Sequence, residues 1–148
     1  MDEDPINFGV LLLIPYRYME GRIFQAVRDA GFDDLTLAQS KVFQRVDPAG
    51  SRLTELAVAA QMTKQSAGVM VDELERFGYV RRVPDPTDGR ARVIHIQKRG
   101  WRAIEAGKAA HDQIVAEWQA YLGTRNFTML CQILEQLREI TDPFAKKP

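Results

Sequence analysis

With 148 residues, 45% of them hydrophobic, the chain is long enough for one compact domain with a sizeable core. Its longest unbroken apolar run, residues 10–14, is too short to span a bilayer, and its acidic start is the wrong flank for a secretory signal, so we expect a cytoplasmic protein with no membrane partner. The net charge is zero, so composition alone neither favours nor excludes nucleic acid as a partner, and the single cysteine excludes an internal disulfide.

Two helices are predicted in the first third of the chain. Residues 5–31 carry apolar side chains at helical spacing, but Pro15 interrupts the pattern. Because proline lacks an amide hydrogen and its ring clashes with the preceding turn, we expect either a kink there or a helix that begins at residue 15. A second helix is predicted over residues 36–47. Its inward-facing side chains are expected to be Leu37, Val42, Phe43 and Val46.

The next two predicted helices are short and separated by a sharp turn. The first covers residues 53–61, and the second covers residues 63–77 and ends at Gly78. On the second helix, apolar residues at spacings of three and four form one face that should pack on a core. These residues are Ala67, Met70, Val71, Leu74 and Phe77. Gln61 lies in the turn, where a left-handed backbone would cost a residue with a side chain on the order of 1 kcal/mol.

A β-hairpin is predicted directly after the second of these helices. Two β-rich runs, residues 79–83 and 91–97, flank the segment PDPTDGR, whose prolines, aspartates and glycine predict a wide tip. The residues SRL, at positions 51–53, are expected to form a short third strand behind this hairpin. Two short helices that are joined by a sharp turn and followed by such a hairpin form a winged helix-turn-helix.

The distribution of charge is more informative than its sum. Residues 63–102 contain nine Lys/Arg and five Asp/Glu, a balance of +4, whereas residues 1–36 contain three and seven, a balance of −4. The predicted reading helix and hairpin are therefore locally basic, which is typical of a nucleic-acid-binding surface, although a solvated charged hairpin would look similar.

Two further helices are predicted between residues 101 and 142. Both carry an apolar stripe, the first with Trp101 and Trp118 and the second with a seam of leucine and isoleucine. This is more apolar surface than a small winged-helix core needs. A second copy of the chain would cover it most simply, and the alternative is that the two ends of one chain cover each other. The expected fold is mostly α with a small β-wing (α+β), a winged helix-turn-helix with N- and C-terminal dimerisation helices.

The segment LTELAVAAQMTKQSAGVMVDELERFGYVRRVPDPTDGRARVIHIQKRG closely resembles the MarR family of bacterial transcription regulators, above all in DELERFGYV and DPTDGRA. MarR-like proteins dimerise through helices from both ends of the chain. The resemblance implies a single MarR-like domain over residues 1–148. Within it, residues 36–100 would form the winged helix-turn-helix, and residues 5–31 and 101–142 the dimerisation helices.

The first half of the helix over residues 63–77 is expected to read DNA. A helix fits the major groove, where its first residues reach base edges and its amides favour phosphate. The outward residues are Thr63, Lys64, Gln65, Ser66, Gly68 and Val69. Gln65 can pair with adenine through two hydrogen bonds, and Lys64 can take guanine or phosphate. At positions 68 and 69 many MarR-like proteins have a hydroxyl group, which this chain lacks. Gly68 can instead admit a close backbone approach, or Val69 can contact a thymine methyl group.

Residues 85–91 are expected to form the wing that enters the minor groove. In MarR-like proteins the pattern Asp-x-Arg lies at the wing tip with the arginine in the minor groove, and here it reads Asp88-Gly89-Arg90. A narrow A·T-rich minor groove has an enhanced negative potential, which attracts a guanidinium group on an exposed loop. Supporting phosphate contacts are expected from Arg92, from Arg81 or Arg82 and, on the backing strand, from Arg52.

An effector site is also implied by the resemblance. Many family members bind small, often phenolic or anionic aromatic compounds between the dimer helices and the winged domain, and their first helix lines that crevice. In this chain Tyr16, Arg17 and Tyr18 would lie there. They could hold an aromatic acid, or they could be dimer contacts.

No catalytic or metal-binding constellation is recognisable. His95 and His111 have no cysteine or carboxylate at ligand spacing, and no Gly-rich phosphate loop or nucleophile motif occurs, so we expect no enzyme, no cofactor and no metal. Cys131 is expected to be a small packing residue. In redox-sensing MarR-like regulators the reactive thiol lies near the amino terminus instead.

The sequence therefore predicts a dimeric DNA-binding transcription regulator. It would be a repressor that a small-molecule effector releases, and it would read a pseudo-palindromic duplex with the helix of residues 63–77 in the major groove and the wing in the minor groove. The alternative is a winged-helix protein-interaction module without specific DNA binding. Strong and salt-sensitive binding to duplex DNA separates the two.

Overall fold

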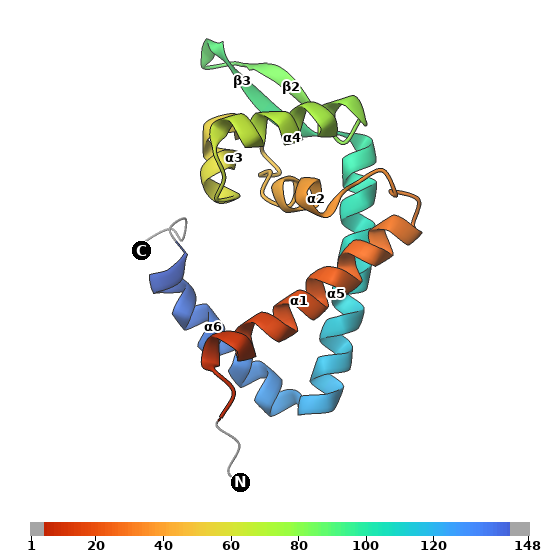
Figure 1. The fold of residues 1–148 in the computed structure, drawn as a ribbon, viewed down its shortest axis with the longest axis vertical. Helices are drawn as coiled ribbons and strands as arrows, with labels where there is room; N and C mark the ends of the chain where they lie inside the picture. Colours follow the sequence, from red (N-terminus) through yellow and green to blue (C-terminus); the bar gives the residue numbers. More distant parts are fainter. Residues whose placement is uncertain (1–4, 143–148) are drawn as a thin grey trace. The chain divides into compact units, whose positions relative to one another are not determined.

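The computed structural model describes residues 5–142, which form six helices and three strands (Figure 1). The helices are α1 (Phe8–Asp29), α2 (Leu37–Phe43), α3 (Leu53–Ala59), α4 (Lys64–Arg76), α5 (Lys98–Leu122) and α6 (Thr124–Thr141). The strands are β1 (Ser51–Arg52), β2 (Val80–Asp85) and β3 (Asp88–Ile96). The prediction of a mostly α fold with a small β-wing is confirmed.

The chain divides into two compact units between Ala110 and His111. The first unit contains α1 to α4, the sheet and the first half of α5, and the second contains the rest of α5 together with α6. The winged helix-turn-helix predicted over residues 36–100 lies wholly within the first unit. Its α4 and its hairpin therefore belong to one compact body.

The core of the first unit forms where α2 and α3 pack on α4 and α4 packs on the sheet. α4 buries Ala67, Val71 and Leu74 completely, while Met70 and Phe77 are partly buried against the core, which confirms the apolar face predicted from spacing. The other elements contribute Val42, Phe43, Val46, Leu56, Tyr79, Val80, Ile94 and Ile96. Burial of these side chains is the main term that holds the unit together.

Helix α1 starts earlier than one of the two predicted alternatives. It runs without interruption from Phe8 through Pro15, and the side chain of Asn7 caps it by accepting a hydrogen bond from the Gly9 amide at 2.8 Å. The expected start at residue 15 is therefore wrong, because this cap supplies a start upstream and the helix accommodates the proline. A kink at Pro15 stays a prediction.

Helix α2 is shorter than predicted. Thr36 and Gln39 form a capping box at its start, with each side chain accepting a hydrogen bond from the backbone amide of the other. The helix ends at Phe43 and does not continue to residue 47. Leu37, predicted to face inward, is 40% exposed, since it lies in the first turn beside the cap rather than over the core.

The three strands form an antiparallel sheet in the order β1-β3-β2. β1 pairs with β3, with Ser51 opposite Ile94, which confirms the short third strand predicted behind the hairpin. β2 and β3 pair regularly from Val80 opposite Ile96 as far as Pro84 opposite Arg92. The hairpin beyond this point is irregular.

The hairpin tip is tighter than the wide loop predicted from its turn-forming residues. β2 continues to Asp85 and β3 begins at Asp88, so only residues 86–87 lie between the strands. The register breaks after Pro84, because Asp85 pairs with Asp88 and leaves residues 89–91 as additional residues on β3. The prediction of a wide tip is wrong because side-chain hydrogen bonds, described below, close the turn.

Two positive φ angles shape the helix-turn-helix. Gln61, in the turn before α4, has φ 54°, so the left-handed backbone considered for this position is present and carries strain on the order of 1 kcal/mol. Gly78 has φ 80° and ends α4 as predicted. Among the helices of residues 5–142, none is long and apolar enough to cross a membrane.

Candidate nucleic-acid interface

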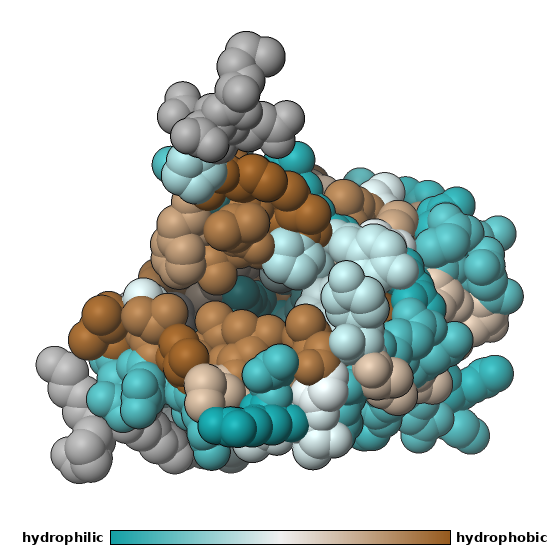
Figure 2. Space-filling model, turned by 90° about the horizontal axis from the view of Figure 1, so that it is seen from below, coloured by the Kyte–Doolittle hydropathy of each residue, from teal (hydrophilic) through white to brown (hydrophobic). Residues whose placement is uncertain are grey.

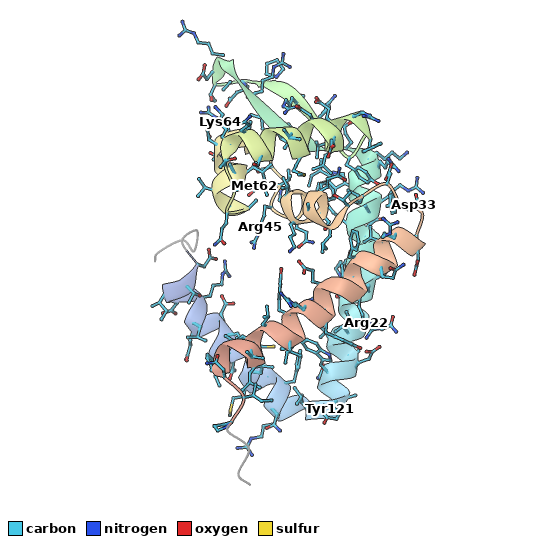
Figure 3. All side chains as sticks on the ribbon, in the orientation of Figure 1. Arg22, Asp33, Arg45, Met62, Lys64 and Tyr121 are labelled. Carbon is cyan, nitrogen blue, oxygen red and sulfur yellow. The ribbon has the colours of Figure 1, made fainter. Side chains whose placement is uncertain are left out.

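The amino end of α4 is capped by Thr63. Its hydroxyl oxygen accepts a hydrogen bond from the Ser66 amide at 3.1 Å, and its hydroxyl group donates to the Ser66 hydroxyl at 2.9 Å. Thr63 is thus a cap that already holds two hydrogen bonds within the protein, while Ser66 keeps its own hydroxyl proton for another acceptor. Lys64 and Gln65 are exposed in the first turn, and Figure 3 shows Lys64 at this end of α4.

Gln65 and Val69 lie one helical turn apart on the exposed side of α4. Residues four apart are neighbours on one helix face, and Val69 is 51% exposed. Between them, a Cβ atom built on Gly68 would lie 3.7 Å from Leu53 Cδ2, which is an ordinary contact. Packing within the protein therefore does not require glycine at this position.

The carboxylate of Asp85 organises the turn of the wing. Its Oδ1 atom accepts hydrogen bonds from the Thr87 amide at 2.8 Å and the Thr87 hydroxyl at 2.7 Å, which closes the turn. Its Oδ2 atom accepts two more from the Arg52 guanidinium, from Nε at 3.0 Å and Nη2 at 2.6 Å. The hydrogen bonds from Thr87, and then those from Arg52, lower the pKa of Asp85 to about 2.

Arg90, the arginine predicted to enter the minor groove, lies among the additional residues of β3 and is exposed. Its amide donates a hydrogen bond to the Asp88 carboxylate at 3.1 Å. The Asp-x-Arg pattern therefore has a local role, because the aspartate shapes the backbone that carries the arginine. The negative charge of Asp88 would repel phosphate, so its contribution is to this backbone.

Arg82 is held by acidic residues of α4. Its guanidinium group pairs with Asp72 at 2.8 Å and with Glu75 at 3.1 Å, and its amide donates to Glu75 at 2.6 Å. Its side chain is 21% exposed. Arg82 thus ties β2 to α4, whereas Arg81, the alternative phosphate contact, is exposed.

Besides Arg76 at the carboxyl end of α4, which lies over the Phe77 ring, four exposed cations lie at the amino end of α4 and on the hairpin. They are Lys64, Arg81, Arg90 and Arg92. Within the described part of the chain, no carboxylate forms an ion pair with any of them, whereas Arg52 and Arg82 are each paired with carboxylates. In Figure 1 the amino end of α4 and the tip of the hairpin lie on the same side of the drawing.

A polar cluster at the base of the hairpin was missed in the sequence. The Tyr79 hydroxyl donates to the Asp34 carboxylate, and Arg99 Nη1 donates to the same carboxylate at 2.8 Å. The Arg99 guanidinium also stacks over the Tyr79 ring, 4.4 Å from its centroid, and donates to the carbonyl of Phe77 at the end of α4. Burial, and then the hydrogen bond to Asp34, raise the pKa of Tyr79. Since Asp34 and Tyr79 are 45 residues apart, no local pattern could have revealed this pairing.

Helix α1 does not bring the three predicted effector residues together. Tyr16, Arg17 and Tyr18 are all exposed, and successive helical residues point about 100° apart. The Tyr16 hydroxyl donates to Glu20 at 3.1 Å, and burial together with this carboxylate raises the pKa of Tyr16. Tyr18 accepts a hydrogen bond from Arg22 at 3.2 Å. The effector site stays a prediction.

Cys131 is exposed on α6, so within a single copy of the chain it is not the packing residue that the sequence predicts. Its apolar neighbours Leu130 and Leu134 are also exposed. No group of three or more potential metal ligands occurs among residues 5–142.

The family model that matches the chain is that of the MarR family, over residues 33–91. This range runs from the loop before α2 to the tip of the wing. Among curated proteins, the chain is similar to the transcriptional regulator HosA of Escherichia coli O111:H-. The identity is 28% over 105 residues, which cover 70% of this chain and 78% of that protein.

Solved structures share the fold over most of the chain. The transcriptional regulator Tm0710 from Thermotoga maritima is 25% identical, with a TM-score of 0.66 and coverage of 95% of this chain and 98% of that one. The transcriptional repressor CouR, in a structure bound to a 23-mer DNA duplex, is 22% identical, with a TM-score of 0.66 and coverage of 88% and 92%. The shared fold therefore extends beyond the helix-turn-helix.

Proposed function

We propose that this chain is a member of the MarR family of transcription regulators and acts as a homodimeric repressor that binds a pseudo-palindromic DNA duplex and is released by a small effector. One observation carries the proposal. The exposed cations of α4 and the hairpin lie in one compact unit, while other groups of the protein hold the carboxylates of Asp72, Glu75 and Asp85. This arrangement favours an anionic partner.

The first turn of α4 is proposed to lie in the major groove. Lys64 contacts a phosphate or a guanine, Gln65 pairs with adenine, and Val69 packs on a thymine methyl group one turn further along. Ser66 donates its hydroxyl proton to an acceptor on the DNA, and Gly68 lets the backbone approach closely. Thr63 contributes by holding the helix start, since its hydroxyl group is bonded to Ser66.

The wing is proposed to lie in the adjacent minor groove. Arg90 enters the groove, where narrow A·T-rich steps concentrate negative potential, and Arg81 and Arg92 contact phosphates beside it. The structure of CouR bound to a DNA duplex supports duplex DNA as the partner of this fold.

A second copy of the chain is proposed to cover the terminal helices. α1 exposes large apolar side chains along its first half, including Phe8 at 66%, Leu11 at 50% and Ile14 at 56%. α6 exposes Met129, Leu130, Ile133, Leu134 and Ile140. Figure 2, which views the chain from below, shows hydrophobic surface in brown. Apolar exposure of this extent is typical of an interface, and two identical subunits would present α4 and the wing to half-sites about one helical turn apart.

The effector is proposed to be a small aromatic or anionic compound that binds along α1. Arg17 supplies the positive charge, and Tyr16 and Tyr18, which point away from it by about 100° on either side of the helix, each offer an exposed ring. Salicylate, a phenolic aromatic acid, is a suitable first probe. If the proposal is right, salicylate releases DNA from the native protein and releases less from Arg17→Ala.

Fluorescence anisotropy with a labelled duplex from the region upstream of the protein's own gene tests DNA binding. At two salt concentrations, the native protein should bind strongly and lose affinity as salt rises. Arg90→Ala should weaken binding at least about tenfold and reduce the slope of log affinity against log salt by about one unit.

Arg45→Ala is the matched control for the loss of one positive charge. Arg45 is exposed, and in Figure 3 it lies on the side of α2 away from α4 and the hairpin. Its loss should leave the salt slope nearly unchanged. Equal effects of the two substitutions would remove the wing from the interface. Binding that is weak and insensitive to salt would instead favour the protein-interaction module.

A further inference from the structure

We infer that Arg52 and Asp85 form a brace that holds the wing tip where Arg90 can reach DNA, so that Arg52 is a positioning residue and not a phosphate contact. The inference rests on the proposed function of the wing. The charge and location of Arg52 predict a contact with a DNA phosphate, whereas here its guanidinium group acts within the protein.

Both carboxylate oxygens of Asp85 accept hydrogen bonds, one from Arg52 and the other from Thr87. Both guanidinium hydrogen bonds, of 3.0 and 2.6 Å, end on Oδ2, while Thr87 donates two to Oδ1. Asp85 is only 8% exposed, although it lies next to the tip of a hairpin. These hydrogen bonds join the turn at Thr87 to Arg52 through one carboxylate, so the tip is held wherever Arg52 is held.

The backbone of Arg52 is fixed by the strand that it ends and by the helix that it caps. It is the last residue of β1, where it pairs with Val93 of β3, and it is the N-cap residue of α3, where its amide donates to Glu55 at 3.0 Å. The next residue, Leu53, reaches toward Gly68 of α4, 3.7 Å from the position of a Cβ atom there. Arg52 therefore contacts the wing turn, and the next residue in the chain lies beside the first half of α4.

The wing tip needs such a support because the regular ladder ends before it. Beyond Pro84 and Arg92 the register breaks, and Arg90 lies in the three additional residues of β3. The local contact to this segment is the bond from the Arg90 amide to Asp88. A mobile tip would have to be ordered when DNA binds, and that entropy loss would weaken the contribution of Arg90.

The brace also neutralises a negative charge close to the proposed DNA surface. Without Arg52, the carboxylate of Asp85 would stand unpaired a few residues from Arg90 and would repel phosphate. Arg52→Ala therefore combines two effects, a looser tip and an exposed charge. Asp85→Asn separates them, because it weakens the brace without leaving a negative charge behind.

A double-mutant cycle with Arg52→Ala and Arg90→Ala tests the brace. Affinities are measured by anisotropy with a duplex recovered from random DNA by selection with the native protein. Arg90→Ala should weaken binding at least about tenfold in the native background and less than about threefold when Arg52 is replaced, because coupled residues give non-additive effects. Arg52→Lys keeps the positive charge but replaces the two donor nitrogens of the guanidinium with one ammonium group, so it should retain more of the coupling than Arg52→Ala.

Arg81→Ala provides the matched control, since it removes an exposed positive charge from the same hairpin without touching Asp85. Its combination with Arg90→Ala should be additive to within about twofold. If Arg90→Ala lowers the affinity for DNA by the same factor with and without Arg52, Arg52 does not position Arg90, although Arg90 still contacts DNA. If Arg90→Ala costs nothing in the native protein, the proposed function of the wing fails first, and the inference fails with it.

A second measurement examines the free protein, so that it does not depend on DNA. The ¹⁵N heteronuclear NOE of the amides of residues 87–90 should fall in both Arg52→Ala and Asp85→Asn and stay unchanged in Arg81→Ala. Thermal unfolding of each variant shows that the winged unit remains folded. Unchanged NOE values in folded Arg52→Ala would contradict the brace, whatever the DNA affinities.

Discussion

α4 and the wing tip are both proposed to touch DNA, yet the protein holds them by different means. α4 is seated by apolar burial, with Ala67, Val71 and Leu74 completely inaccessible to water. At the wing tip, the buried side chain is the charged Asp85. The position of α4 therefore depends on the stability of the whole unit, whereas the position of the wing depends on a few charged contacts that can be altered without unfolding.

The largest effect on the free energy of unfolding is expected in the core beneath α4, where apolar burial holds the helix. Leu74→Ala should lower the free energy of unfolding by about 2–5 kcal/mol, because it removes a completely buried side chain and leaves a cavity. Urea denaturation measures it. Val69→Ala, on the exposed side of the same helix, is the control and should stay within about 0.5 kcal/mol of the native protein. Similar losses for both would mean that α4 is not seated by this face.

A smaller loss is expected at the base of the hairpin, where packing and polar contacts combine. Tyr79→Phe keeps the buried ring but removes the hydrogen bond to Asp34, which Arg99 still contacts. The free energy of unfolding should fall by about 1–2 kcal/mol. Chemical denaturation of the two proteins gives the difference, and no change at all would show that the hydroxyl group is dispensable for stability.

The smallest effect on stability is expected at the wing tip, and it should depend on pH. The pKa of Asp85 is lowered to about 2 in the folded protein, below the usual 3.8, so the carboxylate contributes stability above about pH 4 and loses it as the pH falls toward 2. Because Arg52 remains partly exposed to water, this contribution is screened and modest.

Comparison of the native protein with Asp85→Asn at several pH values measures this contribution. The native protein should be the more stable at pH 6, and the difference should shrink between pH 4 and pH 2. A difference that stays constant over this range would show that the charge of Asp85 does not stabilise the wing.

The difference between the two regions also explains how much the sequence could predict. The apolar face of α4 repeats every three or four residues, so spacing alone identified its five core residues and its end at Gly78. The left-handed backbone at Gln61 could likewise be considered from the sequence, since Gln61 lies in the sharp turn between two predicted helices. The spacing of apolar residues is a local property of the sequence, and it is sufficient to predict this part of the fold.

The contacts of the wing join residues that lie on different helices and strands. Arg52 meets Asp85 across 33 residues, and Arg82 meets Glu75 only because β2 folds back along α4. From the turn-forming residues we therefore predicted a wide tip, and from its charge and location we predicted that Arg52 contacts DNA. Arginines cannot be sorted into exposed and paired ones until their carboxylate partners are placed in space.

Selection of bound duplexes from a random DNA pool by the native protein tests the central claim most directly, because the recovered motif reports both the reading elements and the symmetry. Two identical subunits that each insert α4 and a wing should recover inverted half-sites whose centres lie about 10 base pairs apart, or a multiple of that. Recovery of a single unrepeated half-site, or of no motif at all, would contradict the account.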